Sequence, residues 1–540
     1  MSSYYIGVDV GTGSVRAALV DGGGRIVANE TRALSINSYG GGTCYEQSSE
    51  EIWTACAELI RAVSSALPAG GRVSGCGFCA TCSLVLLDAD FRPVPVRDAG
   101  YDVVMWMDHR AGAEAALVNA SGHADVLQYV GGQVSLEMQL PKILWLKRRA
   151  PAAWRQVAHL FDLPDYLTFR ATGALSRSLC SVTCKWNYSG GGWSRDFLDA
   201  VGLPELYADD CAMIGREILA PGQPVGRGLT EESAAHMGLE PGTKVGASLI
   251  DAHCGAVGMI GARHQGDNDV TKRLGIICGT SSCHMAVSKT PVFVPGIWGP
   301  YHHAMLPGYW LMEGGQSATG KLLDHVVENH PAYGEAVKLR DRRKLPHVHL
   351  LLNALLQERA ERDQVALDTI AGDCHVWPDY HGNRSPVADA GLRGSVCGLS
   401  LDVSLDDLCV QYLACLQALA CGSRHIVAEL EAKGFQIATV HMCGGLSKNE
   451  LFVRAHANVL CKPVVRCREP ETVLIGAAVL AALAAGSYCC IADAMRELSH
   501  VEKVTKPDEA LRPFYEKKYK VFLLMLQHQQ MYRDVMAAAP

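Results

Sequence analysis

The fold of this chain is decided by Tyr4–Asp21, whose sequence is YYIGVDVGTGSVRAALVD. Two β-rich runs flank the turn Gly11-Thr12-Gly13, which is the pattern of a β-hairpin. A turn with two glycines lets backbone N–H groups approach an anion closely. Asp9 ends the first strand and has no evident role in a core, so it could hold a cation beside that anion. The stretch therefore predicts a phosphate-binding hairpin with a metal-side carboxylate.

Two other structures could contain the same turn. A dinucleotide-binding fingerprint needs G-x-G-x-x-G followed by a helix. Here position 16 is Arg and the residues after the turn are β-branched and apolar, so a second strand is expected instead. The other alternative is an ordinary tight turn without a ligand, because a short glycine motif is weak evidence when it stands alone.

A second stretch repeats this design about half a chain later. Arg273–Val287 contains an apolar strand, the turn Gly279-Thr280-Ser281 and a second strand. Internal duplication on this scale predicts two related domains that face one nucleotide.

Length and composition describe a globular protein with a large core. The chain has 540 residues, 49% of them hydrophobic and 19% charged, so two large domains or three ordinary ones are expected. Its 49 basic and 56 acidic residues give a net charge of −7 without a long basic run, which argues against nucleic-acid and anionic-membrane partners. The most apolar run, Val473–Ala485, is too short to span a bilayer and predicts a buried Ala-rich helix. The first strand begins by residue 4, which leaves no room for a signal peptide, so we expect a cytoplasmic location.

The 21 cysteines are expected to be free thiols rather than disulfides, because the chain is long and has no secretion signal. Cys76, Cys79 and Cys82 have the C-x2-C-x2-C spacing of iron–sulfur sites. No downstream Cys-Pro completes that pattern, and a strand would point successive side chains to opposite faces. The spacing alone therefore does not predict a cluster.

Two segments offer polar groups that suit a polyhydroxy ligand. Trp106, Asp108 and Arg110 recur at every second residue, which in an extended segment places all three on one face. The alternative for them is a surface ion pair beside a core Trp. Lys185 stands among apolar and aromatic neighbours, where it either extends outward to solvent or donates to a ligand oxygen.

Asp251 is the candidate general base. A short apolar strand delivers it to the start of a glycine-rich helix, just before the second hairpin. A carboxylate in that place can accept the proton of a substrate hydroxyl while a phosphoryl group is transferred to it. The alternative is a helix N-cap, but the position beside the second hairpin favours catalysis.

Two later glycine motifs are candidates for nucleotide contact. Gly315–Lys321 nearly matches the P-loop pattern G-x4-G-K-[ST], but Leu322 occupies the hydroxyl position and cannot reach Mg²⁺. We therefore reject a P-loop and expect a helix N-terminus that can meet a phosphate. Gly444 and Gly445 form a turn between a strand and a helix start, and their bare backbone would accept a flat adenine or ribose.

Taken together, these segments resemble the FGGY carbohydrate kinases, and specifically their ribulokinase-like branch. The resemblance covers nearly the whole chain. It rests on the runs Asp9–Arg16, Ala80–Ser83, Trp106–Ala111, Cys184–Tyr188, Asp251–Gly255, Gly279–His284, Glu313–Gly320, His381–Pro386 and Cys443–Asn449, in that order.

The resemblance implies an α/β fold with two ribonuclease-H-like domains of the actin/hexokinase superfamily around a nucleotide cleft. Residues 1–254 would form the N-terminal, sugar-binding domain and residues 255–540 the C-terminal, ATP-binding domain. The implied activity is transfer of the γ-phosphoryl group of ATP to a terminal hydroxyl of a ketopentose, D-ribulose first, giving D-ribulose 5-phosphate. L-ribulose or ribitol as the acceptor, or a non-catalytic nucleotide-binding protein of the actin-like superfamily, are the alternatives.

The resemblance also implies roles for individual residues, with ATP and Mg²⁺ as cofactors and a small-molecule sugar as partner. Asp251 matches the general base and Asp9 the Mg²⁺-side carboxylate. The residues expected to bind ATP are Gly11, Thr12, Gly13, Gly279, Thr280, Gly315, Gly444, Gly445 and Asn449. Those expected to bind the sugar are Ala80, Thr81, Trp106, Asp108, Arg110, Lys185 and Glu313.

The chain departs from the family pattern at two positions. Cys79 stands where relatives usually carry Asp, and Cys254 where they usually carry Ala. Both flank expected site residues, so the departures weaken the substrate preference more than the reaction type. A homodimer is compatible with the sequence, which says nothing further about oligomeric state.

Overall fold

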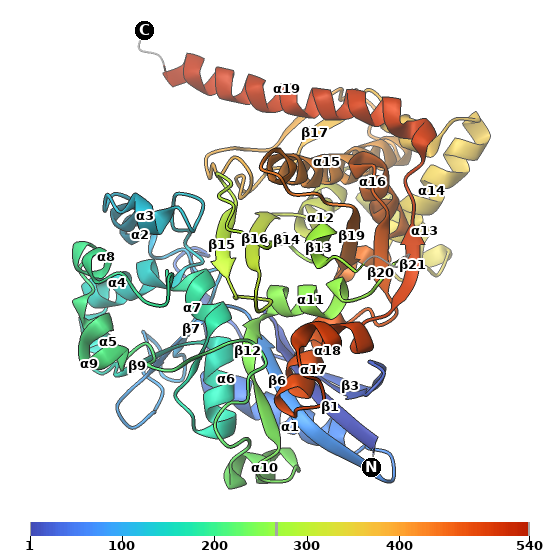
Figure 1. Ribbon diagram of the computed structural model, residues 1–540. Helices are drawn as coiled ribbons and strands as arrows, with labels where there is room; N and C mark the ends of the chain where they lie inside the picture. Colours follow the sequence, from blue (N-terminus) through green and yellow to red (C-terminus); the bar gives the residue numbers. More distant parts are fainter. Residues whose placement is uncertain (1, 265–267, 538–540) are drawn as a thin grey trace. The chain divides into compact units, whose positions relative to one another are not determined.

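The computed structural model describes residues 2–264 and 268–537 of the chain. It divides into two compact α/β units that are each discontinuous in sequence (Figure 1). The first unit comprises Met1–Val270, Val287–Met312 and Cys467–Val501, and the second comprises Thr271–Ala286, Glu313–Arg466 and Glu502–Pro540. The division of labour between residues 1–254 and 255–540 stays a prediction.

The first unit is built on a five-stranded sheet with the order β12-β6-β1-β2-β3. Its strands are β1 (Ser2–Val10), β2 (Ser14–Asp21), β3 (Ile26–Ala33), β6 (Gly71–Ala80) and β12 (Lys244–Ile250). β1 and β2 are antiparallel and place Asp9 opposite Arg16, which confirms the predicted hairpin. β6 runs parallel to both β1 and β12, so these three strands end at one edge of the sheet.

The two faces of this sheet pack differently because the side chains of β1 alternate in size. Ile6, Val8 and Val10 point into a core that includes residues of α1 (Ser49–Ser64). On the other face, an added Cβ at Gly7 would lie 2.2 Å from the carbonyl oxygen of Leu474. Only glycine leaves room for a helix to approach the sheet that closely.

The helix on that glycine face is α17 (Thr472–Ala484), the predicted buried, Ala-rich segment. It comes from the far end of the chain and lies beside β1 and β6 (Figure 1). It also crosses α11 (Asp251–Ile260) at two glycines. An added Cβ at Gly258 would lie 1.8 Å from the carbonyl oxygen of Thr472, and one at Gly476 would lie 1.9 Å from that of Cys254.

A second five-stranded sheet in this unit has the order β4-β5-β8-β7-β9. Its strands are β4 (Asn37–Tyr39), β5 (Cys44–Gln47), β7 (Leu84–Leu87), β8 (Val103–Val104) and β9 (His159–Asp162). The other elements of the unit are α2 (Gly112–Asn119), α3 (Ala124–Leu127), α4 (Gln139–Arg149), α5 (Pro151–Trp154), α6 (Leu163–Thr172), β10 (Arg177–Ser178), α7 (Leu179–Lys185), α8 (Arg195–Ala200), α9 (Ala208–Cys211), β11 (Ile218–Leu219), α10 (Glu231–Met237), β15 (Trp298–His302) and α18 (Ile491–Leu498).

The second unit repeats the topology of the first. The strands that this unit contributes to its sheet run in the order β16-β14-β13-β19-β20-β21. Its strands are β13 (Arg273–Cys278), β14 (Ser282–Ser288), β16 (Trp310–Gln316), β19 (Thr439–Cys443), β20 (Val464–Cys467) and β21 (Val501–Thr505). β13 and β14 form an antiparallel hairpin, and β13, β19 and β20 are parallel. The arrangement matches β3-β2-β1-β6-β12 strand for strand, as expected for a duplicated domain.

Long helices complete the second unit. They are α12 (Gly320–Glu328), α13 (Tyr333–Arg342), α14 (Val348–Asp363), α15 (Leu405–Ala432), α16 (Glu450–Leu460) and α19 (Arg512–Ala537). A small pair of strands, β17 (His375–Trp377) and β18 (Ser395–Cys397), packs against α15 and α19. The core beneath α19 contains Trp377, Tyr515 and Phe522.

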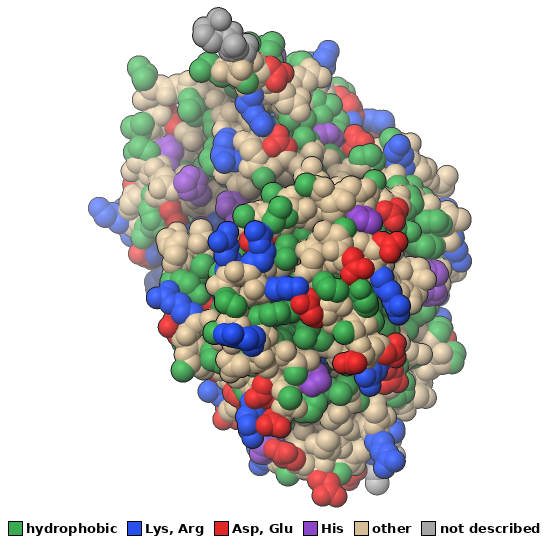
Figure 2. All heavy atoms as spheres, turned by 90° about the vertical axis from the view of Figure 1, so that its left-hand side faces the viewer, with side chains coloured by type: hydrophobic (Ala, Val, Ile, Leu, Met, Phe, Trp, Pro, Cys, Tyr) green, Lys and Arg blue, Asp and Glu red, His purple; other side chains and the backbone are tan. Residues whose placement is uncertain are grey.

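The remaining expectations from the sequence concern the state of the cysteines, membrane-spanning helices and the distribution of surface charge. All 21 cysteines are thiols rather than disulfides, as predicted. Cys76 packs in the core beside α1, whereas Cys79 donates to the carbonyl of Val8 and lies near Asp9. Among residues 2–264 and 268–537, no helix is long and apolar enough to cross a membrane. On the face drawn in Figure 2, basic and acidic side chains are interspersed.

Candidate active site

The carboxyl ends of three parallel strands bring the expected residues of the first unit together. In the sheet register Asp9 lies beside Cys79 and Val10 beside Ala80, and Ala80 lies beside Ile250 on its other side. Asp251 follows Ile250 directly. In open α/β sheets, ligands bind outside the carboxyl ends of the strands. Asp9, Ala80 and Asp251 therefore meet at the edge where a ligand is expected.

Asp9 is buried and forms an ion pair with Arg16, which also pairs with Glu471. Burial raises the pKa of the Asp9 carboxyl, and the guanidinium of Arg16 limits that rise. The thiol of Cys79 lies 3.9 Å from Oδ1 of Asp9. Sequence reasoning missed both Arg16 and Glu471. The hairpin register could have revealed Arg16, but Glu471 is 455 residues away from it.

Asp251 is the first residue of α11, and the N-cap is Ile250. Its Oδ1 accepts the N–H of Ala252 at 2.7 Å. The carboxylate is half-buried, so part of it stays accessible to a ligand. Its place in the first turn puts the carboxylate at the positive end of the helix dipole. The geometry suits a general base at the mouth of the sheet edge.

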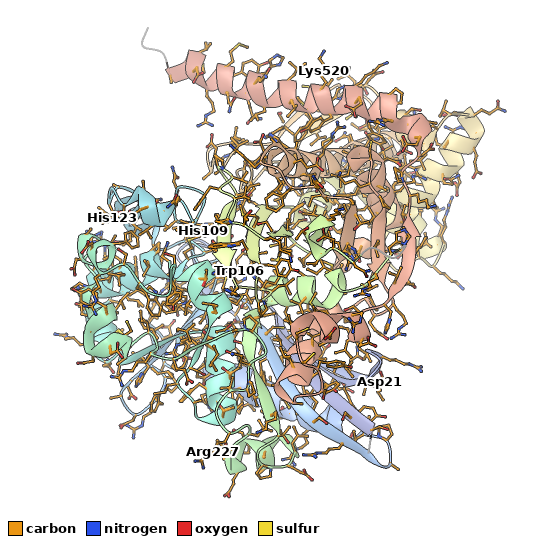
Figure 3. The ribbon with its side chains drawn as sticks, viewed as in Figure 1. Asp21, Trp106, His109, His123, Arg227 and Lys520 are labelled. Atoms are coloured by element: carbon orange, nitrogen blue, oxygen red, sulfur yellow. The ribbon has the colours of Figure 1, made fainter. Side chains whose placement is uncertain are left out.

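The turn of the first hairpin is tied to the predicted sugar residues through Trp106. The indole Nε1 donates to Oγ1 of Thr12 at 3.0 Å, and the backbone N–H of Trp106 donates to Oγ of Ser83 at 3.1 Å. That hydroxyl also lies 3.1 Å from Oγ1 of Thr81, which is buried. Trp106 and His109, labelled in Figure 3, lie in the loop after β8. This aromatic side chain connects the two predicted contact sets.

The one-face arrangement expected of Trp106, Asp108 and Arg110 is wrong, because residues 105–110 form turns rather than a strand. Asp108 is fully buried and accepts two bonds from the guanidinium of Arg110, at 2.8 and 2.7 Å. It also accepts the backbone N–H groups of Tyr45 and Arg110. A third guanidinium nitrogen of Arg110 donates to Glu46 at 2.9 Å. Sugar contact by Asp108 and Arg110 stays a prediction, and their bonds suit a role in positioning the Trp106 loop.

Lys185 does not extend to solvent. It ends α7 with 2% of its surface exposed, and its Nζ lies 3.9 Å from Oε2 of Glu137 and 4.4 Å from the ring centroid of Trp298. The outward alternative is therefore wrong, and donation to a ligand oxygen stays a prediction.

A second buried lysine, Lys142 on α4, was missed. Its Nζ donates to the carbonyl of Trp106 at 3.4 Å, and burial lowers its pKa. Nearby, Asp162 accepts bonds from Gln139 and Trp186, and burial raises its pKa to about 7. A Lys on a helix that also carries Lys147, Arg148 and Arg149 gives no sequence signal that would separate it from a surface residue.

In the second unit, two glycine turns meet at the carboxyl edge of the sheet. The turn Gly279-Thr280 follows β13, and Gly444-Gly445 follows the adjacent parallel strand β19. Gly444 has φ +89°, and an added Cβ there would lie 2.3 Å from the carbonyl oxygen of Cys278. This glycine is required by the fold itself.

Packing does not require glycine at four other turn positions, which are Gly11 and Gly13 in the first unit and Gly279 and Gly445 in the second. An added Cβ at Gly13 or Gly445 would meet nothing within 4 Å, and those at Gly11 and Gly279 would come no closer than 3.7 and 3.8 Å to any atom. None of the four has a positive φ. Packing therefore does not require glycine at these positions, and the close approach of a ligand stays the predicted reason for it.

One expectation for the nucleotide residues changes and another stays untested. The N–H groups of Thr319, Gly320 and Lys321 donate to carbonyls of the β13–β14 turn at 2.8, 3.1 and 3.3 Å. The expectation that these groups at the start of α12 meet a phosphate is therefore wrong. Gly315 is buried, and an added Cβ there would lie 2.6 Å from the carbonyl oxygen of Ser282. Its contact with ATP stays a prediction.

Asn449 is the N-cap of α16 and is held on both ends of its amide. Oδ1 accepts the N–H groups of Leu451 and Phe452 and the side chain of Asn353. Nδ2 donates to the hydroxyl of Tyr412 at 2.7 Å. The amide thus fixes the loop that begins at Gly444, and its predicted contact with ATP is untested.

Glu313 is 3% exposed and accepts a bond at 2.9 Å from Arg384, whose side chain is also mostly buried. Arg384 further contacts the thiol of Cys283 at 3.7 Å. Arg384 lies within the motif His381–Pro386 but was not predicted as a site residue. Its ion pair orients the carboxylate that is expected to contact the sugar.

The donor set of the first unit fits a magnesium ion. Mg²⁺ prefers oxygen ligands, keeps several waters and is usually bound through one or two carboxylates together with phosphates. Asp9 offers a buried carboxylate at the ligand-binding edge, and Asp251 lies at the same edge. Because Asp9 is also paired with Arg16, contact through a metal-bound water fits better than direct coordination by both oxygens.

Comparison with known proteins identifies the family. Residues 4–258 match the N-terminal domain of the FGGY family of carbohydrate kinases, and residues 274–485 match its C-terminal domain. An FGGY carbohydrate kinase domain-containing protein of Danio rerio is 50% identical, over 98% of each chain. A D-ribulokinase of Saccharomyces cerevisiae is 36% identical, over 90% of this chain and 72% of its own length. The crystal structure of a xylulose kinase from Rhodospirillum rubrum has the same fold, with a TM-score of 0.79 and 22% identity over 98% of this chain and 99% of its own.

Proposed function

We propose that this chain, which belongs to the FGGY family and is a carbohydrate kinase, phosphorylates a terminal hydroxyl of a ketopentose, with D-ribulose as the preferred substrate. The observation that carries the proposal is the position of Asp251 at the carboxyl edge shared by β1, β6 and β12. L-ribulose and ribitol are the alternative acceptors.

Asp251 acts as the general base. Its carboxylate accepts the proton of the substrate hydroxyl as that oxygen bonds to the γ-phosphorus and the bond to the ADP oxygen breaks. A positioned general base typically contributes about 10²–10⁴-fold in rate. Its place in the first turn of α11 fixes the carboxylate at the mouth of the sheet edge.

ATP and Mg²⁺ are the proposed cofactors. The exposed turns Gly279-Thr280 and Gly444-Gly445 offer backbone to the nucleotide, and the turn Gly11-Thr12-Gly13 offers backbone N–H groups to its phosphates. When bound, Mg²⁺ neutralises negative charge on the phosphate oxygens. Asp9 would hold that ion through water, with Arg16 fixing the carboxylate.

Support for a ketose comes from Lys185. A buried ammonium that contacts a carboxylate and an indole ring can donate to a sugar carbonyl. A shorter polyol such as glycerol has no carbonyl for this donor, so it should be a poor substrate. The sequence similarity to the yeast D-ribulokinase supports D-ribulose as the first choice.

The proposal also covers the partners, the location and the oligomeric state of the protein. The substrate is a small-molecule sugar, the location is cytoplasmic, and no nucleic acid or membrane takes part. A homodimer remains compatible with it.

The test is release of ADP, measured by a coupled assay with D-ribulose, L-ribulose, ribitol, D-xylulose and glycerol under one set of conditions. We expect the highest kcat/KM for D-ribulose. Glycerol or D-xylulose ahead of both ribuloses by tenfold would refute the ribulose assignment. ATP binding without ADP release on any polyol would instead favour the non-catalytic alternative.

The same assay tests the base. Asp251→Asn should lose about 10²–10⁴-fold in kcat while ATP still binds. Asp21→Asn is the matched control, because Asp21, labelled in Figure 3, accepts two backbone N–H groups at the far end of the hairpin. A near-normal kcat for Asp251→Asn would discard the mechanism.

A further inference from the structure

Three metal-ligating side chains meet inside the first unit, outside the residues assigned above. Cys180 and Cys184 stand four residues apart on α7, and His253 lies on α11. All three side chains are fully buried, and their ligand atoms lie within 4.8 Å of one another. Residues four apart on a helix share one face, so both thiols are presented to the same point.

One of these separations is that of two ligands in a zinc site. Sγ of Cys184 lies 3.6 Å from Nε2 of His253. In a tetrahedral centre with Zn–S of about 2.3 Å and Zn–N of about 2.0 Å, the sulfur and nitrogen ligands stand roughly 3.5 Å apart. The two donors are therefore already at the separation that zinc requires, before any ion binds.

We propose that Cys180, Cys184 and His253 form a binding site for a thiophilic cation, Zn²⁺ first. Two thiolates and one imidazole select soft or borderline cations over Mg²⁺ and Ca²⁺, which prefer oxygen. The fourth ligand would be water or Cys254, which follows His253 on α11.

The site is joined to two residues of the proposed reaction. Cys184 immediately precedes Lys185 on α7, and His253 is two residues after Asp251 on α11. A metal ion that bonds to both helices fixes the distance between them. Bound Zn²⁺ therefore restrains the proposed sugar donor and the proposed base together, and we expect it to inhibit turnover. This consequence rests on the proposed function, whereas the binding itself does not.

Binding also releases protons. The cysteines bind as thiolates, so each Zn²⁺ that enters displaces about two protons, one from each thiol. The affinity should accordingly rise with pH. Proton release is measured on the unmodified protein and needs no kinase activity.

The experiment must exclude two other clusters of potential ligands. Cys489, Cys490 and Asp493 form an exposed group, and Asp324, His347 and His349 form another. The first is removed by a background variant with Cys489→Ser and Cys490→Ser. The second contains no sulfur, so it does not contribute to a sulfur-to-metal charge-transfer band.

The background protein is titrated with CdCl₂ while the charge-transfer band of cadmium thiolate is followed. We expect one saturating equivalent, and adding Cys180→Ser should weaken binding at least about tenfold. Cys56→Ser is the matched control, since Cys56 is an equally buried thiol on α1. A background protein without the band, or a band that Cys180→Ser leaves unchanged, overturns the proposal.

Two further measurements keep the test decisive. Cys180→Ala is used if Cys180→Ser does not fold, and fewer than about one proton released per Zn²⁺ by the background protein counts against thiolate ligation. In the ADP-release assay, Zn²⁺ should inhibit the background protein at least about tenfold more strongly than Cys180→Ser. Cadmium binding with equal inhibition of both would keep the site and overturn its coupling to catalysis, and the binding results stand even if no sugar is phosphorylated.

Discussion

The proposed nucleotide contact of the glycine turns can be tested, because the fold requires glycine at one of two neighbouring positions and not at the other. Gly445 has open space around an added Cβ and no positive φ, whereas Gly444 has φ +89° and a carbonyl oxygen 2.3 Å from that Cβ. Gly445→Ala should therefore fold normally and bind ATP poorly. Gly444→Ala should fold poorly whether or not a nucleotide binds.

The magnitudes follow from these contacts. A methyl group forced against a close-packed ligand typically costs about 1–3 kcal/mol, which corresponds to a rise of roughly 5- to 150-fold in the Kd for ATP. For Gly444→Ala, backbone strain alone costs about 1–3 kcal/mol. Each kcal/mol lowers Tm by about 2–4 °C in a domain of this size.

The assay compares Tm by thermal unfolding with the Kd for ATP by calorimetry. Gly334→Ala on α13 is the control, since an added Cβ there also meets nothing within 4 Å and its φ is not positive. It should leave ATP affinity unchanged and raise Tm slightly, because Ala is the better helix former. If Gly445→Ala bound ATP as tightly as the unmodified protein, the open space would be solvent and the argument from the turn would fail.

Three further predictions concern side chains that sequence reasoning missed. Asp162 has a pKa of about 7 in the folded protein, above its unfolded value near 3.9, so the folded state binds more protons and the free energy of unfolding falls as pH rises from about 4 to 7. The Tm of Asp162→Asn relative to the unmodified protein should therefore increase across that range. A Tm difference that does not change with pH would contradict the assignment. Glu471→Gln removes the charge that pairs with Arg16 and so weakens the positioning of Asp9 by Arg16. It should raise the Mg²⁺ concentration for half-maximal rate by roughly 3- to 10-fold with Tm nearly constant. An unchanged Mg²⁺ requirement would show that Glu471 does not act on the proposed metal site. Arg384→Lys removes the planar guanidinium that orients Glu313. It should raise the KM for the sugar about 10-fold while the KM for ATP stays the same. Equal rises in both KM values would show a general disturbance of the structure.

Local patterns in the sequence predicted the framework because its determinants are local. The hairpins around Gly11-Thr12-Gly13 and Gly279-Thr280-Ser281 follow from glycines between β-rich runs, and both formed in the predicted places. Asp251 was placed at a strand-to-helix junction for the same reason, and the structure has that junction. Each of these features depends on residues that are close together in the sequence.

Features that depend on residues distant in the sequence could not be predicted from local patterns. Trp106, Asp108 and Arg110 were expected on one extended face, but Asp108 finds stronger partners in Arg110 and two backbone N–H groups and bends the segment into a turn. The start of α12 looked open to a phosphate, yet its N–H groups are taken by carbonyls of the hairpin at Gly279 and Thr280. Periodicity and spacing cannot show such competition, because the competing groups come from elsewhere in the chain.

One such distant segment positions both carboxylates of the first unit. Glu471 pairs with Arg16, which pairs with Asp9, and the neighbouring carbonyl of Thr472 lies against Gly258 on the helix that begins at Asp251. The first interaction is electrostatic and fixes where a cation beside Asp9 can sit. The second is steric and fixes how closely α11 can approach α17. Because both act through consecutive residues at the start of α17, displacement of that helix would disturb the metal-side carboxylate and the base at once. This explains why a segment so late in the sequence packs in the first unit, where the predicted chemistry needs it.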